Sequence, residues 1–483
     1  MNTKNILLLV VAFFTMNVMI AQNEIDALRF SRTEWSGTAR FIGAGGAFGA
    51  VGADFSALST NPASIGLFKK TEISITPLNF SILRSESTYN DELTPTTKVK
   101  NSFSNLGIVF AWDGATGSKW KKGQFAIGFN QIMNFSNNFA VEGRSNGSSM
   151  GQAFAEAGSG FLYDELPLEQ HFAYQAYIID PVNNSASNTE YVSPLVRKDL
   201  LQKTTVNTTG KINELAFSFG GNYDDKFFAG ATLGVPFLSY TETRKYEESD
   251  DNNLIDHLNS FYINDKLMVN STGVNLKIGV LYQPVSFLRI GAAFHTPTLY
   301  SNVHDILERE MVSMGDTTLN VSYTNDYNYQ LITPMRVMAN VAFLIMKRGF
   351  ISADYEYTDY SKSEMGAYGA NTYLFKDENK AIRDSYKGTH SIRIGGELYV
   401  TKNVLLRGGY SYTSSPYQNN INDASLQTGS FGLGFRGTTF FADVAYQLKA
   451  SQQNYWFFNH EMVNPVNQYF LSHSIVGTIG WKL

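Results

Sequence analysis

The sequence predicts an all-β fold, a 14-stranded antiparallel transmembrane β-barrel with an N-terminal segment in its lumen. Aromatic residues make up 14% of the chain and charged residues only 17%, whereas soluble domains carry roughly 25% charged residues. Apolar and polar residues alternate with period two over most of the chain, as they do in half-buried strands. The connections between these alternating segments are short and long in turn, which is the plan of an outer-membrane barrel.

Residues 1–21 have the pattern of an export signal peptide. Lys4 supplies the positive start, residues 6–20 are mostly apolar, and Ala21 is a small residue suited to cleavage. The chain has no cysteine, so it forms no disulfide and carries no lipid on a cysteine. No later apolar stretch reaches the length of about 18 residues that a transmembrane helix needs, so we expect the chain to cross a membrane with strands.

Alternation identifies the individual strands. In residues 349–360, Ile351 and Tyr355 lie on one face, whereas Ser352 and Glu356 lie on the other. Fourteen segments show such a pattern: 72–84, 102–113, 123–136, 211–221, 226–240, 271–282, 287–297, 334–345, 349–360, 387–399, 403–413, 426–436, 438–449 and 470–483.

Every second connection is long. The long connections are 85–101, 137–210, 241–270, 298–333, 361–386, 414–425 and 450–469. This parity predicts short periplasmic turns and long extracellular loops, and an even strand number places both chain ends in the periplasm. Residues 137–210 could hold another strand pair, which would make sixteen strands. Helix-like spacing in 162–179 and 253–262 predicts short helices within the loops.

Tryptophans mark one rim of the predicted barrel. Trp112 ends the second strand, Trp120 precedes the third, and Trp481 nearly ends the last. All three positions fall at the periplasmic end, where outer-membrane barrels carry an aromatic girdle.

The segment 22–70 is rich in small residues, and Gly43, Gly45 and Gly49 resemble the spacing of a nucleotide-binding loop. A nucleotide loop needs a strand before it and a helix after it within a βαβ unit, and this sequence offers neither. A 14-stranded barrel is too wide for its own side chains to fill. We therefore predict that residues 22–70 form a compact plug and residues 71–483 form the barrel.

The plug carries a recognisable motif. Its residues run from Gly46-Ala47 through Ala53-Asp54 and Ser56-Ala57-Leu58 to Asn61-Pro62-Ala63 and Gly66-Leu67. This run resembles the N-terminal signature of the FadL/TodX family, outer-membrane channels for long-chain fatty acids and other hydrophobic compounds. The motif positions are Asp54, Ser56, Asn61, Pro62 and Ala63. Where the family often has two consecutive acidic residues, this chain has Asp54-Phe55.

The resemblance implies a mechanism. Extracellular loops would capture the compound, the plug would act as a movable hatch, and the cargo would leave sideways near a kink in the third strand. In 123–136, Gln131 interrupts an apolar outward face, and Gly128 and Asn130 lie beside it. We therefore predict a local break in strand pairing around Gly128–Gln131 that forms a lateral opening. A register shift or a glutamine at the membrane interface explains the pattern equally well.

Two groups of residues are candidates for ligand binding. Arg289, Arg336 and Arg393 point into the lumen and could pair with a carboxylate, although pairing with luminal acids and the hatch is the favoured interpretation. The second group is the loop stretch Tyr455, Trp456, Phe457 and Phe458. Four successive aromatic residues could form an apolar docking patch, and packing against neighbouring loops is an equally good explanation.

Together these features predict an outer-membrane uptake channel for hydrophobic compounds such as long-chain fatty acids. The expected location is the outer membrane of a Gram-negative-type bacterium, where a monomer contacts outer-membrane lipid and hydrophobic small molecules. The net charge of −5 does not suggest nucleic-acid binding. We expect no catalytic residues, metal or cofactor, because the chain has no H-E-x-x-H motif and no cysteine, and its seven histidines show no metal-ligand spacing.

Other functions remain open at this stage. They are a general porin, a haem-related receptor using His295, a structural or adhesive barrel, and a Ser-His lipid hydrolase.

Overall fold

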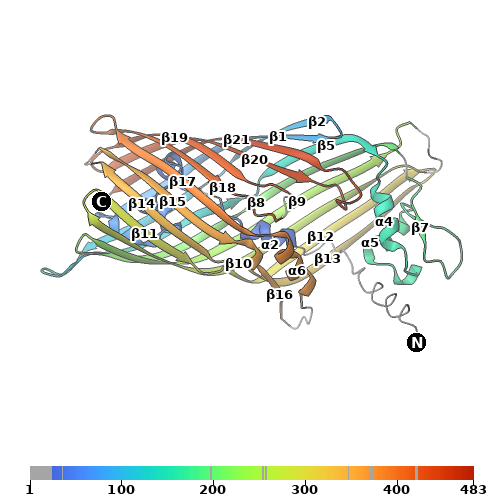
Figure 1. Cartoon of the computed structure of the whole chain (residues 1–483), viewed down its shortest axis with the longest axis horizontal. Helices are drawn as coiled ribbons and strands as arrows, with labels where there is room; N and C mark the ends of the chain where they lie inside the picture. Colours follow the sequence, from blue (N-terminus) through green and yellow to red (C-terminus); the bar gives the residue numbers. More distant parts are fainter. Residues whose placement is uncertain are drawn as a thin grey trace.

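The computed structural model describes residues 24–483 except 35, 196–197, 253–254, 256–257, 346–347, 370–373 and 419–421. The predicted signal peptide, residues 1–21, lies outside the described residues. The chain forms one closed antiparallel barrel with its N-terminal segment inside (Figure 1). Within the described ranges, no helix is long and apolar enough to cross a membrane.

Fourteen strands make up the wall, and five of them are interrupted and carry two labels. β21 pairs with β1 and closes the barrel. The strands are β1 (Glu72–Tyr89), β2 (Glu92–Asn101) with β3 (Asn105–Asp113), β4 (Trp120–Asn134) with β5 (Asn137–Asn146), β8 (Lys198–Tyr223), β9 (Phe227–Ser249), β10 (Leu258–Val285), β11 (Leu288–His295) with β12 (Leu299–Gly315), β13 (Thr318–Ile332) with β14 (Arg336–Ile345), β15 (Gly349–Asp359) with β16 (Glu364–Ala367), β17 (Gly388–Tyr399), β18 (Val404–Thr413), β19 (Leu426–Arg436), β20 (Phe440–Tyr455) and β21 (Val466–Lys482).

Each predicted segment overlaps one of these strands, so the predicted fold class and strand number are confirmed. The strands continue beyond the predicted segments at the end with the long connections. Residues 298–333 form most of the β12–β13 hairpin, and 137–210 contributes β5 and half of β8 instead of an extra strand pair. The helix predicted in 253–262 is wrong where it is described, because β10 begins at Leu258.

The strand extensions were missed for a physical reason. Between the short turns and these extensions, the wall exposes an apolar belt. Residues at the edge of the belt next to the extensions include Phe237, Val274, Leu299 and Met335. Above the belt the outward positions of β9 are polar, as at Lys245, and those of β12 alternate between polar residues such as Glu308 and apolar ones such as Ile306. Because both faces of these extensions carry polar residues, hydrophobic alternation gives little signal there.

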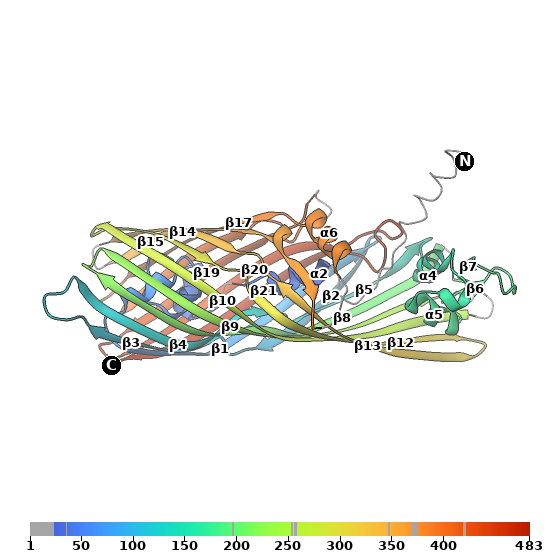
Figure 2. The ribbon, with the colours of Figure 1, turned by 90° about the horizontal axis from the view of Figure 1, so that it is seen from below.

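The short turns gather at the barrel end that holds the C-terminus (Figures 1 and 2). Trp112, Trp120 and Trp481 lie at strand ends there and are 52%, 51% and 39% exposed. The predicted position of the tryptophans at this rim agrees with the structure.

The opposite end carries a small cap built from residues 147–195 (Figures 1 and 2). The cap contains α4 (Met150–Gly158), η3 (Tyr163–Glu165), α5 (Leu168–Gln175) and the paired strands β6 (Asp180–Pro181) and β7 (Tyr191–Val192). α5 lies within the stretch 162–179 that was predicted to be helical. The buried Glu248 carboxylate of β9 anchors the cap, because it accepts hydrogen bonds from Ser149 Oγ at 2.5 Å and from the Met150 amide at 2.7 Å.

Two further elements follow in later connections of the chain. They are η4 (Tyr360–Lys362) and α6 (Lys376–Ser385).

Residues 24–70, here called the hatch, fill the lumen (Figure 2). The hatch contains α2 (Glu24–Ser31), α3 (Ala39–Gly43) and two 3₁₀ turns, η1 (Phe55–Ser59) and η2 (Pro62–Leu67). Three polar side chains begin these short elements: Thr38 caps α3, Asp54 caps η1 and Asn61 caps η2. Such caps satisfy backbone N–H groups that a short helix leaves unpaired.

Buried charges join the hatch to the wall. Arg407 is 2% exposed and contacts Glu397 and Asp443, each at 2.7 Å. Arg40 of the hatch reaches the same Glu397 at 3.0 Å, and Arg436 contacts Asp443 at 2.9 Å. Removing one member of such a network leaves the opposite charge buried, which costs much more than losing an exposed pair.

We therefore expect Arg407→Met to destabilise the folded barrel by about 3 kcal/mol, because two buried carboxylates lose a shared cation. The measurement is the temperature at which the barrel unfolds in detergent and changes its gel mobility. Lys380→Met is the control, since Lys380 forms an exposed pair with Asp384 on α6. Equal unfolding temperatures for both variants would contradict this account of the network.

Candidate functional site

The Asn-Pro-Ala motif lies against the wall. Asn61 is fully buried, and its Oδ1 accepts a hydrogen bond from the Ala63 amide at 3.1 Å. Its Nδ2 donates to Asn340 Oδ1 of β14 at 3.0 Å. One side chain thus caps η2 and ties the hatch to the barrel at the same time.

The other motif residues hold the hatch together internally. Asp54 accepts hydrogen bonds from Thr38 Oγ1 at 2.8 and 2.9 Å and from the Ser56 amide at 3.0 Å. Ser56 Oγ accepts from the Thr38 amide at 2.7 Å. These bonds join the start of α3 to the start of η1, so the segment between them forms a closed loop.

Glycines of the wall let the hatch approach closely. A Cβ atom on Gly230 would lie 2.4 Å from the Pro62 carbonyl oxygen, and one on Gly279 would lie 2.0 Å from Asn61 Oδ1. A Cβ on Gly409 would lie 2.2 Å from the Gly45 amide nitrogen. Since real Cβ atoms do not approach so closely, these wall positions require glycine for the hatch to sit where it does.

The space left between hatch and wall is small. A cavity of about 70 Å³ lies there, which is room for a few water molecules. Phe41, Ile132 and Met338 line part of it, and its polar lining residues include Ser59, Asn130, Glu214, Lys277, His295 and Arg336. Lys277 pairs with Glu214, and His295 Nε2 lies 2.8 Å from the Thr60 carbonyl oxygen. A larger compound does not fit in this cavity unless the hatch moves.

The three candidate arginines contact the hatch and luminal acids. Arg289 donates to the Val51 carbonyl at 2.8 Å, and Arg336 donates to the Ser31 carbonyl at 2.7 Å. Arg393 is fully buried and lies 3.4 Å from Glu356. This arrangement is the one favoured from the sequence.

The wall has a seam in its extracellular half, which we define as the gap between β2 and β5. The ladder between β3 and β4 runs from Asp113↔Lys122 to Asn105↔Asn130 and ends there. Among the described residues, no backbone ladder joins β2 to β5, although β2 pairs with β1 and β5 pairs with β8. Two strand edges therefore face each other in the wall without pairing.

Side chains bridge the seam in place of a ladder. Lys98 Nζ donates to the carbonyl oxygens of Asn137 at 3.1 Å and Thr208 at 2.9 Å. Thr94 Oγ1 accepts from the Glu142 amide at 3.2 Å. These contacts supply hydrogen bonds to some of the backbone groups at the two unpaired edges, but each is a separate bond that water could replace.

The structure places the residues predicted for the lateral opening at the base of this seam. Gly128 is paired on both sides, with Gly107 and Ala216. Asn130 ends the ladder, and a bulge follows between Gln131 and Met133. Gln131 is only 2% exposed, so it does not lie on the outward face as the alternation suggested.

The loop aromatics are packed and do not form an exposed patch. Phe457 is 1% exposed, and its ring lies 4.9 Å from that of Tyr89 and 5.4 Å from that of Tyr246. Tyr455 packs on Phe139 at 5.1 Å. Trp456 and Phe458 are partly buried beside the same cluster. This stretch therefore joins extracellular elements, as the second interpretation of the sequence proposed.

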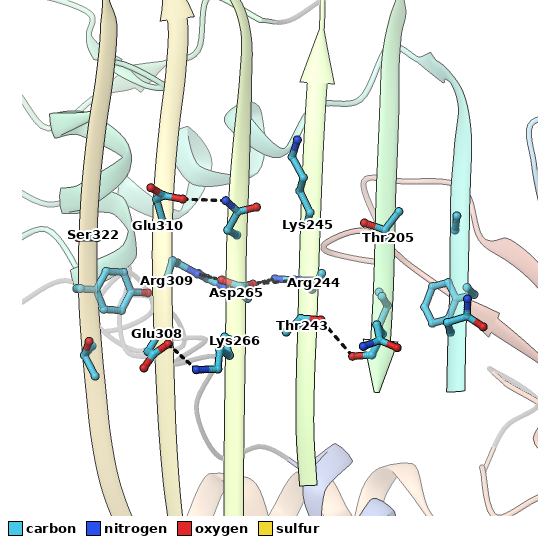
Figure 3. Close-up of a pocket in the computed structure, with 18 of the residues that line it drawn as sticks. Thr205, Thr243, Arg244, Lys245, Asp265, Lys266, Glu308, Arg309, Glu310 and Ser322 are labelled. Atoms are coloured by element: carbon cyan, nitrogen blue, oxygen red, sulfur yellow. Dashed lines mark hydrogen bonds and ion pairs between the residues drawn. The ribbon is translucent and has the colours of Figure 1, made fainter. Parts of the chain in front are cut away.

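A groove of about 770 Å³ crosses the strand extensions above the apolar belt (Figure 3). Arg244, Asp265 and Arg309 form a row across β9, β10 and β12, with N–O distances of 2.5 Å on either side of Asp265. Burial raises the pKa of Asp265, but the two guanidinium groups outweigh it and lower the pKa to about 2. Arg309 also binds Glu169 of α5 at 2.5 Å, so the row anchors the cap.

Sequence reasoning missed the extent of the seam, because 85–101 was taken for a loop. One signal was present. Pro95 lies within β2, and proline cannot donate to a ladder, so it marks a strand edge. In the part of the chain that the structure describes, no group of three or more His, Cys, Asp or Glu residues could hold a metal.

Comparison with known proteins identifies the family. The family described as outer membrane protein transport protein (OMPP1/FadL/TodX) matches residues 206–470, more than half of the chain. The chain belongs to this family. Membership places it in the outer membrane of a Gram-negative-type bacterium and among transport proteins. A search of curated proteins finds no match.

Solved structures of FadL/TodX proteins share the fold at low sequence identity. A FadL homologue of Pseudomonas aeruginosa has a TM-score of 0.55 and 13% identity, over 93% of this chain and 98% of that chain. The toluene transporter TodX of Pseudomonas putida has a TM-score of 0.53 and 11% identity, over 93% and 99%. The toluene transporter TbuX of Ralstonia pickettii has a TM-score of 0.51 and 14% identity, over 93% and 100%.

We expect Asn61→Ala to loosen the seated hatch by about 2 kcal/mol, because η2 loses its cap and Asn340 loses a partner. Single-channel recording should then show more frequent open events than in the unmodified protein. Ser64→Ala is the matched control, since Ser64 is buried in the same turn and its hydroxyl has no hydrogen-bond partner among the described residues. If both variants stay equally silent, Asn61 does not hold the hatch.

Proposed function

We propose that this outer-membrane channel for hydrophobic compounds captures its cargo at the extracellular cap, passes it beside the hatch and releases it sideways through the seam. Two observations together support this route most strongly. The hatch fills the lumen, and one described stretch of the wall has no backbone ladder between its strands. A compound that enters from outside meets the hatch, and the nearest wall without a backbone ladder is the seam between β2 and β5.

The surface beside the seam suits an apolar cargo. Leu93 and Val99 on β2 are 58% and 59% exposed, and Leu106 on β3 is 46% exposed. On its outer face, an opening at this place would have these apolar side chains beside the polar ones, such as Lys98, that bridge the seam. Apolar compounds could therefore leave through the wall toward lipid and would not need to pass the whole length of the hatch.

The cap offers a first contact for apolar compounds. Six large apolar side chains on it are exposed: Leu162, Tyr163, Leu168, Tyr177, Val182 and Val192. Exposed apolar groups of this kind usually mark an interaction site. They take the capture role that the sequence had suggested for residues 455–458.

The class of cargo has two candidates. Long-chain fatty acids are the first, as the resemblance of the hatch motif implies. Uncharged aromatic compounds are the second, and the pairing of Arg289, Arg336 and Arg393 favours them, because a carboxylate would have to displace an existing partner. A general porin is disfavoured by the small space that remains between hatch and wall.

Joining the two sides of the seam should stop uptake. The experiment replaces Ser102 and Gln131 with cysteine, since Ser102 Oγ lies 3.3 Å from Gln131 Oε1. Cells that lack their own fatty-acid channel express the variant and are treated with a short, reducible thiol cross-linker. We expect uptake of labelled long-chain fatty acid or labelled toluene to fall to background after cross-linking and to recover on reduction, because the exit can no longer widen.

A matched pair on the closed wall controls for the chemistry. Ser391 and Thr413 are ladder partners on β17 and β18 with hydroxyl oxygens 2.8 Å apart, so a cross-link between cysteines there should leave uptake unchanged. Uptake that persists with a complete cross-link at residues 102 and 131 would reject the lateral route. Uptake of toluene but not of fatty acid by the untreated channel would decide the class of cargo.

A further inference from the structure

The Phe55 ring of the hatch occupies a notch in the wall formed by two glycines. A Cβ atom on Gly107 would lie 2.2 Å from Phe55 Cε2, and one on Gly128 would lie 2.1 Å from Phe55 Cζ. Phe55 is 2% exposed and packs with Leu58, Ile65, Phe68, Val109 and Ala126. Neither glycine could carry a side chain while the ring is in place.

The notch lies directly below the seam. Gly107 and Gly128 face each other on β3 and β4, and the next inward pair, Asn105↔Asn130, is the last of that ladder. Asn130 Nδ2 also donates to Ser59 Oγ at 2.8 Å. Phe55 and Ser59 are the two ends of η1. A single turn of the hatch therefore contacts the last two inward pairs of strands before pairing stops.

The hatch also touches the same strand above the ladder, where Ile132 and Met133 pack against the cluster that contains Phe30. The Glu34 amide donates to the Ile132 carbonyl oxygen of β4 at 2.9 Å. This bond and the Ser59 contact involve small or backbone groups that could re-form after a shift of the strand. The Phe55 ring differs, because its fit depends on the shape of the notch and cannot be replaced by water.

We propose that Phe55 couples the hatch to the seam. While the ring fills the notch, it holds β3 and β4 in the register that closes the base of the seam. When η1 moves, the ring leaves the notch between the two glycines and no longer restrains β4. This inference rests on the proposed lateral route and adds the residue that links hatch movement to wall opening.

The backbone around Phe55 is suited to such a movement. Gly52 and Ala53 have φ values of 67° and 50°, so the chain reverses immediately before η1. A non-glycine residue with positive φ is held by its surroundings at some conformational cost. Here the surroundings are the Asp54 bonds to Thr38 and Ser56. If the hatch were displaced, the backbone at Gly52 and Ala53 could relax and the Phe55 ring could leave the notch at the same time.

The test measures seam opening without any cargo. The chain has no cysteine, so Gln131→Cys introduces a single thiol at a position that is 2% exposed and whose Nε2 has no hydrogen-bond partner among the described residues. Its rate of labelling by a small thiol reagent, measured in outer-membrane fragments, reports how often the base of the seam opens.

Four variants are compared in this background. Phe55→Ala should raise the labelling rate by about tenfold or more, because a well-packed ring is lost and a cavity is left. Gly107→Ala should also raise it, since the three nearest atoms to the added methyl all belong to the Phe55 ring. The double variant should label close to the starting rate, because the methyl of residue 107 fills part of the vacated space. Phe48→Ala is the control, a fully buried hatch aromatic that packs on Phe350 at 5.4 Å, away from the seam.

Two results would overturn the proposal: an unchanged labelling rate in Phe55→Ala, or an equal rise in Phe48→Ala. Gel mobility confirms that each barrel is folded before labelling. The outcome is independent of transport. If the labelling rate depends on Phe55 but cross-linking of residues 102 and 131 leaves uptake intact, the coupling stands and the lateral route fails. If cross-linking stops uptake but the labelling rate does not depend on Phe55, the lateral route stands without a role for Phe55.

Discussion

Close approach between the backbone of the hatch and the backbone of the wall organises this molecule. At Gly409, Gly230 and Gly279 the wall has no side chain where the hatch arrives, and a Cβ atom added to Gly43 would lie only 3.1 Å from the Gly432 Cα. These contacts place short turns tightly against strands, and the cavity beside Asn130 and Lys277 has a volume of only about 70 Å³. The small luminal cavity, the pairing of the luminal charges and the proposed side exit all depend on this fit.

The buried ion pairs add orientation to this fit. A pair such as Arg40–Glu397 contributes little net stability, because removing two charges from water offsets most of their attraction. It does penalise any other position of the hatch, since a shift would take Arg40 away from its carboxylate and leave Glu397 with Arg407 alone. We infer that the contacts at the wall glycines determine how closely the hatch approaches the wall, and that the ion pairs determine its orientation in the lumen.

Much of the barrel could be predicted from sequence, because a lipid-facing strand must alternate and a periplasmic turn must be short. The strand extensions could not, since charged residues lie on both faces of β12, as the buried Arg309 and the exposed Glu308 show. Within the site, the motif pointed to Asn61 and Asp54, whose capping roles follow from residue type. The seam and the notch for Phe55 depend on which strand fails to pair, and a single sequence gives only a faint sign of that, the proline at position 95.

In the proposed lateral route, the way the seam is bridged affects how selective the outer membrane stays during transport. A backbone ladder is cooperative, because each bond fixes the geometry of the next. Lys98, Thr94 and Asn90 instead cross the gap with independent bonds to single groups on the far side. Such bonds can give way one at a time, so the gap need widen only as far as the passing molecule requires. A wall that parts in this graded manner admits an apolar solute while leaving no continuous water path for ions or hydrophilic toxins.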